Sequence, residues 1–244
     1  MSGKVAIVTG GARGIGRAVG LRLAESGWSI AFCHRKSAEA ADATARAIED
    51  RGGRALHGVY DVSDPKACEA FVARVLGEWG RVDALVNGAG PYTRVPLLES
   101  SLQSWHEMFD HNLDPVFYMS RLVAEPMQRQ RSGRIVSFSM ANADQMVGQP
   151  QLTAHYIAKV GVLVLTRTLA RILGPHGITV NAVSPGFIDS GSAPPEELQK
   201  MVKSIPAGYV GHLDDAVSAV RYLLSEEARY VNGANLHLSG GWGI

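Results

Sequence analysis

The sequence contains little cysteine, little surplus charge and no long apolar run. Its two cysteines, Cys33 and Cys68, lie far apart, with no CxxC pair and no histidine at metal-ligand spacing. Neither a disulfide framework nor a metal site is therefore predicted, and both residues are expected to be inert packing residues. The 24 basic and 23 acidic side chains are spread along 244 residues and nearly cancel. This balance argues against nucleic acid or an anionic membrane as a partner.

Two further absences concern location. The most apolar window, Val160–Thr166, is far shorter than the roughly 18 residues that a membrane span needs. The first residues, MSGKVAIVTGG, run straight into a strand-like segment, without the basic region, apolar stretch and cleavage site of a secretory signal. We therefore expect a cytoplasmic location and no membrane partner.

The residues present alternate between short β-branched runs and longer helical patterns. Segments such as AEAADATARAIEDRG and PKACEAFVARVLGEWG have apolar residues every three to four positions and end in Gly, as helices do. Repeated strand, helix, strand units predict an α/β fold with a doubly wound parallel sheet of about seven strands and helices on both faces. The expected strands are Val5–Thr9, Ser29–Cys33, Arg54–Val59, Ala84–Val86, Arg134–Ser139, Thr179–Val183 and Asn235–Leu238.

The chain shows no internal division. No linker, composition shift or repeat interrupts it, so residues 1–244 are expected to form one domain. The loosest segment, Asp189–Leu198, directly follows the end of an expected strand. Because ligands of doubly wound sheets bind beyond the carboxyl ends of the strands, we interpret residues 189–205 as a substrate lid. A solvent-exposed linker is the alternative.

A glycine-rich turn follows the first expected strand. Gly10, Gly14 and Gly16 separate that strand from a helix start, and glycines there let a pyrophosphate approach the backbone amides and the positive helix end. The spacing is Gly-x-x-x-Gly-x-Gly and not the Gly-x-Gly-x-x-Gly of the dinucleotide motif. Its position at the first strand-to-helix turn nevertheless favours a dinucleotide over a tight turn without a ligand.

The end of the second expected strand lacks an acidic residue. A cofactor without a 2′-phosphate favours a carboxylate there, about 20 positions after the glycines, to accept from the ribose hydroxyl. This chain has Cys33-His34-Arg35-Lys36 instead, and Arg13 in the glycine turn adds a second guanidinium. Such cations suit a 2′-phosphate, so NADPH is predicted in preference to NADH. In the alternative interpretation, Arg35 and Lys36 form only a solvated helix start.

These motifs, taken with others along the chain, resemble those of the short-chain dehydrogenase/reductase family, which has a Rossmann-type fold. The resemblance covers essentially the whole chain and is nearest in look to the 3-oxoacyl-acyl-carrier-protein reductases. It implies that Ile15 and His34 lie with the cofactor-binding residues and that Lys159 binds the nicotinamide ribose. The residues that carry it are Thr9, Gly10, Gly14, Gly16, Asp61, Val62, Asn87, Gly88, Ala89, Gly90, Asn112, Lys159, Pro185, Gly186 and the terminal NGANLHLSGGW.

The resemblance also implies roles for three further segments. Asp61 and Val62 would face the adenine, and Asn87, Gly88 and Ala89 would back the cofactor. The stretch from Pro185 and Gly186 to Ile188 would hold the nicotinamide side. Helices around Leu102–Gln130 and Gln151–Gly174 resemble those that join subunits in the family, so a homodimer or homotetramer is expected.

The chain departs from the family where the chemistry occurs. The family uses a tyrosine four residues ahead of the lysine, a serine that bonds the substrate carbonyl, and an asparagine, here Asn112, that supports a water relay. Here the tyrosine position holds His155, and Tyr156 is one residue late. The serine position falls on Met140 or, counted back from His155, on Asn142. Ser139, Asn142 and Asp144 are the polar candidates to replace that serine.

Two residues compete for the role of proton donor. Side chains three and four positions before Lys159 both lie beside it on a helix, but adjacent residues diverge by about 100° around the axis. The family register favours His155. Chemistry favours Tyr156, because a lysine cation is needed to stabilise a phenolate. Beside an imidazole the same cation lowers the pKa and leaves a neutral ring, so the lysine is less useful to a histidine. Both remain candidates, and a site with neither as donor is the third possibility.

The sequence thus predicts an NADPH-dependent carbonyl reductase that converts a ketone to the alcohol. A 3-oxoacyl thioester or related β-keto compound, free or carrier-linked, is the expected substrate. The alternatives are a specialised reductase of cyclic or aromatic ketones and a nucleotide-binding protein that has lost turnover. Tyr92, after the fourth expected strand, either contacts substrate or caps the turn.

Overall fold

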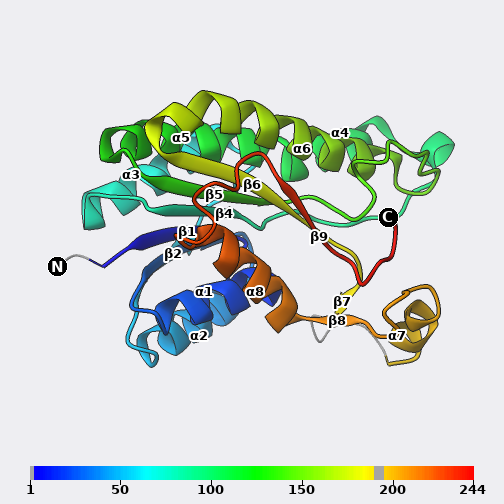
Figure 1. Ribbon diagram of the computed structural model, residues 1–244, viewed down its shortest axis with the longest axis horizontal. Coiled ribbons are helices and arrows are strands. Elements are labelled where there is room, and N and C mark those ends of the chain that lie inside the picture. The colour runs from blue at the N-terminus through cyan, green and yellow to red at the C-terminus, as the bar shows by residue number, and fades with distance from the viewer. Residues whose placement is uncertain (1–2, 190–194) are drawn as a thin grey trace.

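The protein is described by a computed structural model in residues 3–189 and 195–244. Seven parallel strands form one sheet in the order β3-β2-β1-β4-β5-β6-β9, which confirms the predicted doubly wound Rossmann-type arrangement (Figure 1). The strands are β1 (Val5–Thr9), β2 (Ser29–His34), β3 (Arg54–Val59), β4 (Ala84–Asn87), β5 (Gly133–Phe138), β6 (Ile178–Pro185) and β9 (Asn235–Leu238).

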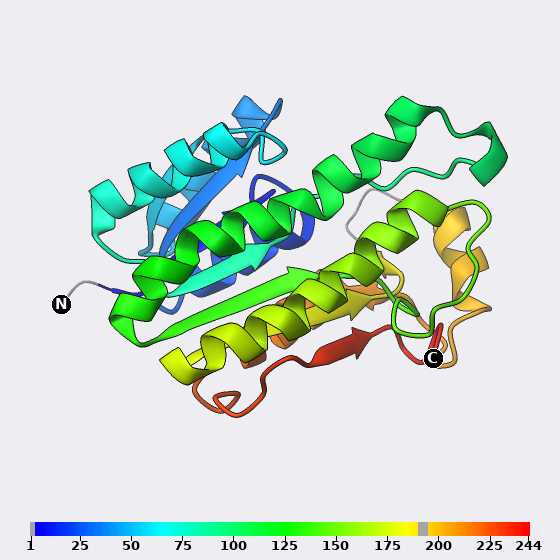
Figure 2. The ribbon, with the colours of Figure 1, turned by 90° about the horizontal axis from the view of Figure 1, so that it is seen from above.

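Helices cover both faces of this sheet. One face packs against α1 (Gly14–Ala24), α2 (Ala38–Glu49) and α8 (Leu213–Leu224), and the other against α3 (Pro65–Trp79), α4 (Leu102–Asn112), α5 (Asp114–Gln130) and α6 (Thr153–Leu173) (Figures 1 and 2). Strand β1 is an unbroken apolar run because both of its faces are buried. Its side chains alternate between the two faces, so Ala6 and Val8 enter one core while Val5 and Ile7 enter the other.

The structure corrects several predicted boundaries. Strands β2, β4 and β6 run further toward their carboxyl ends than expected, and β5 is Gly133–Phe138, one residue earlier than expected. Elements not predicted are a short parallel pair, β7 (Ile188–Asp189) with β8 (Gly211–His212), two single 3-10 turns, η1 (Leu97–Glu99) and η2 (Gly174–His176), and helix α7 (Pro195–Val202). These elements are too short to produce a periodic pattern in the sequence.

The long helix expected around residues 102–130 is two helices. The helix is interrupted at Leu113, between α4 and α5, and Pro115 lies in the first turn of α5. Proline has no N–H to donate to the carbonyl four residues earlier, so it starts a helix more readily than it continues one. The break places Asn112 at the end of α4, where its side chain is buried.

The predicted lid is only partly covered by the described residues. Positions 190–194 lie outside them, whereas Asp189 ends β7 and α7 occupies much of the remainder. In the part of the chain that the structure describes, no helix is both long and apolar enough to cross a membrane.

Candidate active site

The glycine turn and the end of β4 meet at the carboxyl edge of the sheet. The Thr9 hydroxyl accepts hydrogen bonds from the amides of Gly88 and Ala89, at 3.0 and 3.2 Å. Gly10 has φ +69°, and a Cβ on it would come within 3.1 Å of the Ala89 backbone. A side chain at Gly16 would lie 2.7 Å from the Gly10 carbonyl oxygen. Glycine is therefore required for the two loops to approach this closely.

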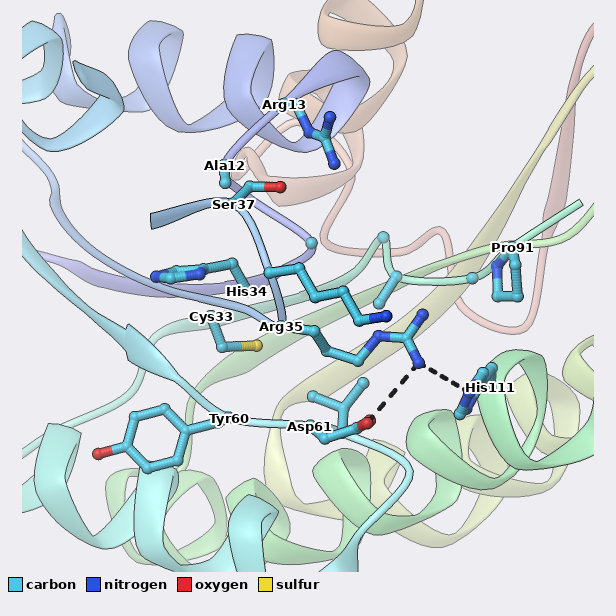
Figure 3. Close-up of a pocket in the computed structure, with 16 residues that line it drawn as sticks. Ala12, Arg13, Cys33, His34, Arg35, Ser37, Tyr60, Asp61, Pro91 and His111 are labelled. Carbon is cyan, nitrogen blue, oxygen red and sulfur yellow. Dashed lines mark hydrogen bonds and ion pairs between the residues drawn. The ribbon is translucent and has the colours of Figure 1, made fainter. Parts of the chain in front are cut away.

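A cavity of about 390 Å³ opens above this turn, between the ends of β1, β2, β3 and β4 (Figure 3). It brings together eight of the predicted cofactor-binding residues: Gly10, Arg13, His34, Arg35, Asp61, Val62, Gly88 and Ala89. The other predicted site residues do not line it: Gly14, Ile15, Gly16, Asn87, Asn112, Ser139, His155, Tyr156, Lys159, Pro185, Gly186 and Ile188.

Arg35 is the central charge of this cavity. One of its terminal nitrogens lies 2.9 Å from His111 Nε2 and 3.7 Å from the Asp61 carboxylate (Figure 3). Burial acts to raise the pKa of Asp61, but hydrogen bonds from the amide and hydroxyl of Ser63 and the charge of Arg35 outweigh it and lower that pKa. Asp61 is thus an ionised partner that holds Arg35 across the cavity.

His34 has a different orientation from its neighbour. Figure 3 shows its ring directed away from Arg35, and the ring centroid lies 6.0 Å from that of His57. Burial, followed by the neighbouring His57, lowers the pKa of His34. Its imidazole is therefore a neutral packing group beside the cavity, and the cations that face a ligand come from other residues.

The residues that line the cavity fit a dinucleotide that carries a 2′-phosphate. Gly14 has φ +56° and nothing within 4 Å of the position of a Cβ, so its exposed side is open at the amino end of α1. That helix end attracts anions through its free amides and dipole. Arg13, Arg35 and Lys36 supply cations, and β2 ends in His34 with no carboxylate.

Sequence reasoning missed some lining residues. Ser37, Tyr60, Pro91 and His111 also border the cavity. His111 is the closest polar partner of Arg35. Its position next to Asn112 was the one feature of the sequence that could have placed it near the site. Among residues 3–189 and 195–244, no cluster of three or more His, Cys, Asp or Glu could hold a metal ion.

Helix α6 directs the two candidate proton donors, His155 and Tyr156, toward different neighbours. It is α-helical throughout, and the Tyr156 amide donates to the Leu152 carbonyl at 2.8 Å in the ordinary pattern, so no bulge shifts the register. The Tyr156 hydroxyl donates to the Asn142 carbonyl at 2.8 Å and accepts from the Val147 amide at 3.0 Å. The phenol therefore binds the loop that follows β5.

His155 occupies the position four residues before Lys159. The residue is 6% exposed, its Nδ1 has no hydrogen-bond partner among the described residues, and its ring meets the Tyr92 ring edge-on with centroids 5.3 Å apart. Burial, followed by the charge of Lys159, lowers the pKa of His155 to about 4, although the nearby Pro91 carbonyl opposes this change. The imidazole is therefore neutral at pH 7.

The buried side chain of Lys159 extends from α6 to the end of β5. Its Nζ donates to the Phe138 carbonyl at 3.0 Å, and burial lowers its pKa to about 8. The Ser139 hydroxyl donates to the Lys159 carbonyl at 2.8 Å. Asn112 Nδ2 donates to the Pro91 carbonyl at 3.2 Å.

The loop after β5 is joined to β6 and to the C-terminal segment by polar contacts. Asn142 has φ +60°, and Asp144 lies 2.8 Å from His237 Nε2. The Ala141 amide donates to the Pro185 carbonyl at 2.9 Å, which joins this loop to the end of β6. Of the three candidates for the family serine, Ser139 and Asp144 thus bond to protein groups, whereas the buried Asn142 Oδ1 has no hydrogen-bond partner among the described residues.

The sheet order, the glycine turn and the lysine-bearing helix together define a class of protein. The chain belongs to the short-chain dehydrogenase/reductase family of oxidoreductases.

Comparison with known proteins supports this assignment over nearly the whole length. The family described as "Enoyl-(Acyl carrier protein) reductase" matches residues 10–243. The chain is 37% identical over 241 residues to the 3-oxoacyl-[acyl-carrier-protein] reductase FabG of Staphylococcus aureus, which covers 98% of this chain and 97% of that protein. Among solved structures, acetoin dehydrogenase YohF from Salmonella typhimurium superposes with a TM-score of 0.88 at 33% identity, covering 98% of this chain and 97% of that one. Levodione reductase gives a TM-score of 0.90 at 28% identity, with coverage of 98% and 96%.

Proposed function

We propose that the protein is an NADPH-dependent carbonyl reductase that converts a ketone to an alcohol. The observation that carries this proposal is the set of cations above the glycine turn, Arg13, Arg35 and Lys36, together with the absence of a carboxylate at the end of β2. A guanidinium binds a 2′-phosphate through charge-assisted hydrogen bonds, whereas NADH selection favours a carboxylate there.

The relatives suggest the class of ketone. A 3-oxoacyl thioester or related β-keto compound is the leading substrate, because the curated relative is named as a 3-oxoacyl-[acyl-carrier-protein] reductase. The names of the structural relatives, acetoin dehydrogenase and levodione reductase, support small or cyclic ketones as the second candidate.

His155, and not Tyr156, is assigned to the reacting carbonyl. The Tyr156 hydroxyl holds two backbone groups of the loop, whereas His155 stands in the register that the family reserves for its donor. A neutral imidazole polarises a carbonyl by donating its one N–H, as triosephosphate isomerase illustrates. The substrate oxygen would accept that hydrogen, since the buried His155 Nδ1 has no hydrogen-bond partner among the described residues.

The proton itself is assigned to Lys159. At neutral pH its ammonium, with a pKa of about 8, can release a proton far more readily than a neutral imidazole can. When bound, the nicotinamide supplies the hydride. Asn112 donates to the Pro91 carbonyl and so fixes the turn whose Tyr92 contacts His155.

Self-association belongs to the same proposal. Apolar side chains remain exposed on α5 and α6, namely Phe117, Ile157, Val164 and Ile172. Their burial in a homodimer or homotetramer would remove them from water. Light scattering on purified protein tests this, and a monomer at micromolar concentration would contradict it.

The cofactor assignment is tested with Arg35→Gln and with Arg46→Gln as the matched control. Arg46 is an exposed arginine on α2 that does not line the cavity, so both variants lose one charge. We expect Arg35→Gln to weaken NADPH binding about tenfold to hundredfold, measured by calorimetry, with little change for NADH. Equal loss for both nucleotides would contradict 2′-phosphate recognition.

Turnover is tested by nicotinamide oxidation with β-ketoacyl thioesters, acetoin and cyclic diketones. We expect reduction of at least one of these classes. Tight NADPH binding with no turnover across the panel would instead identify a nucleotide-binding protein that has lost its activity.

A further inference from the structure

The turn after β4 carries an arginine, Arg94, two residues after the tyrosine that contacts His155. The Arg94 Nε donates to the Tyr92 hydroxyl at 3.0 Å, and the guanidinium carbon lies 5.9 Å from the Tyr92 ring centroid. The same ring meets the His155 imidazole edge-on at 5.3 Å. Tyr92 therefore joins a buried imidazole, on one side, to an exposed cation on the other.

This turn is anchored to the segment that enters α6. The Val95 amide donates to the Gln151 carbonyl and the Leu97 amide to the Pro150 carbonyl, each at 2.9 Å. The backbone on which Arg94 stands is thus fixed relative to His155. A guanidinium held by its own hydrogen bond and by a fixed backbone loses less conformational entropy when it binds a ligand.

Arg94 also lacks a compensating charge. Within residues 3–189 and 195–244, no carboxylate lies within 4.0 Å of its guanidinium, in contrast to Arg35, which faces Asp61. The Tyr92 hydroxyl engages only the Nε, which leaves the two terminal nitrogens as donors toward solvent. Two donors on one planar group suit the paired oxygens of a carboxylate or phosphate.

We propose that the substrate carries an anionic oxygen group that binds Arg94 while its carbonyl lies at His155. This assignment rests on the proposed carbonyl reductase function and adds to it the charge of the substrate. The two ring contacts keep the guanidinium no farther from the imidazole than the sum of their lengths. An oxo acid with a few carbon atoms spans this distance when extended, and the longer pantetheine arm of a carrier thioester spans it when folded. The group is a carboxylate in a free oxo acid or a phosphate in a thioester of the carrier type.

The test compares each anionic substrate with a neutral partner that carries the same reacting carbonyl. For the carboxylate, the pair is 5-oxohexanoate and its methyl ester. For the phosphate, it is acetoacetyl-coenzyme A and the acetoacetyl thioester of N-acetylcysteamine. We expect Arg94→Gln to lower the ratio of kcat/KM for the anionic substrate to that of its neutral partner about tenfold to hundredfold in one of the two pairs. The pair that responds identifies the source of the anion.

Two further variants sharpen the result. Arg46→Gln, which removes a charge from α2, should leave both ratios within about twofold of the wild type, since Arg46 lies outside the site. Arg94→Lys keeps the charge but loses the planar fork, so its ratio should fall between those of the wild type and Arg94→Gln. A ratio unchanged in Arg94→Gln for both pairs would overturn the proposal.

A second readout does not depend on turnover. Coenzyme A or 5-oxohexanoate should raise the unfolding temperature of the wild-type protein and not that of Arg94→Gln. If no substrate is reduced but this difference persists, the anion site stands while the reductase function fails. If neither compound stabilises the wild type more than the variant, the anion site is refuted whatever the enzyme reduces.

Discussion

Replacing Tyr156 by phenylalanine separates a structural role from a chemical one. The substitution removes only the hydroxyl and keeps the buried ring, so packing is preserved. In the structure that hydroxyl donates to the Asn142 carbonyl and accepts from the Val147 amide. We therefore expect Tyr156→Phe to destabilise the fold and to leave the chemical step largely intact.

The burial of the two partners sets the size of this effect. The buried Asn142 carbonyl keeps its other hydrogen bond, from the Gln145 amide at 3.0 Å, so the lost bond costs about 1 kcal/mol there. Val147 is 40% exposed, and its amide regains water, which limits its share to roughly 0.5 kcal/mol. The total, about 1.5 kcal/mol, corresponds to a fall of roughly 3–6 °C in Tm for a chain of this size.

Thermal unfolding and single-turnover reduction of the same variants provide the assay. Tyr156→Phe should keep kcat within a few-fold of the wild type at a temperature where it is fully folded. His155→Gln should lose about 10²–10⁴ in kcat. The reasoning is refuted if Tyr156→Phe loses that factor at an unchanged Tm, because the hydroxyl would then act on the substrate and not on the loop.

Two pH measurements follow from the buried groups on α6. The proposed reduction uses the Lys159 ammonium, whose pKa burial lowers to about 8, so the rate should be level below pH 8 and fall about tenfold per unit above it; a rate that stays constant to pH 10 would contradict this. His155 has a folded pKa of about 4 against an ordinary value of 6.5, so the unfolded chain binds the extra proton between these values. Stability should therefore fall by up to about 3 kcal/mol from pH 6.5 to 4 in urea titrations, and His155→Gln should lose most of this dependence.

Most of the sheet could be predicted from the sequence because its strands are buried on both faces. Such strands read as short unbroken apolar runs, and glycine turns mark where they end. The break at Leu113 was missed because the apolar pattern continues across it, although Pro115 marks the first turn of the new helix. The pair β7 and β8 was missed because two residues per strand carry no periodicity.

The candidate site divides in the same way. The glycine turn was predictable because backbone geometry alone demands glycine there, as the close approach of Gly10 to Ala89 shows. The orientation of Tyr156 was not predictable. Helical spacing places it beside Lys159 as readily as His155, and the choice depends on where the Asn142 carbonyl and the Val147 amide lie in the folded loop. Those positions arise from tertiary structure.

Placing an imidazole where the family has a phenol changes what Lys159 must do. Beside a phenol with an ordinary pKa near 10, a cation is needed to stabilise the phenolate. Beside His155, the same cation adds to burial in keeping the ring neutral, with one N–H to direct at an acceptor. Burial alone lowers the pKa of the Lys159 ammonium to about 8, so this shift does not require a neighbouring tyrosine. In the proposed reaction the two positions thus exchange tasks: residue 155 polarises the carbonyl, and residue 159 gives up the proton.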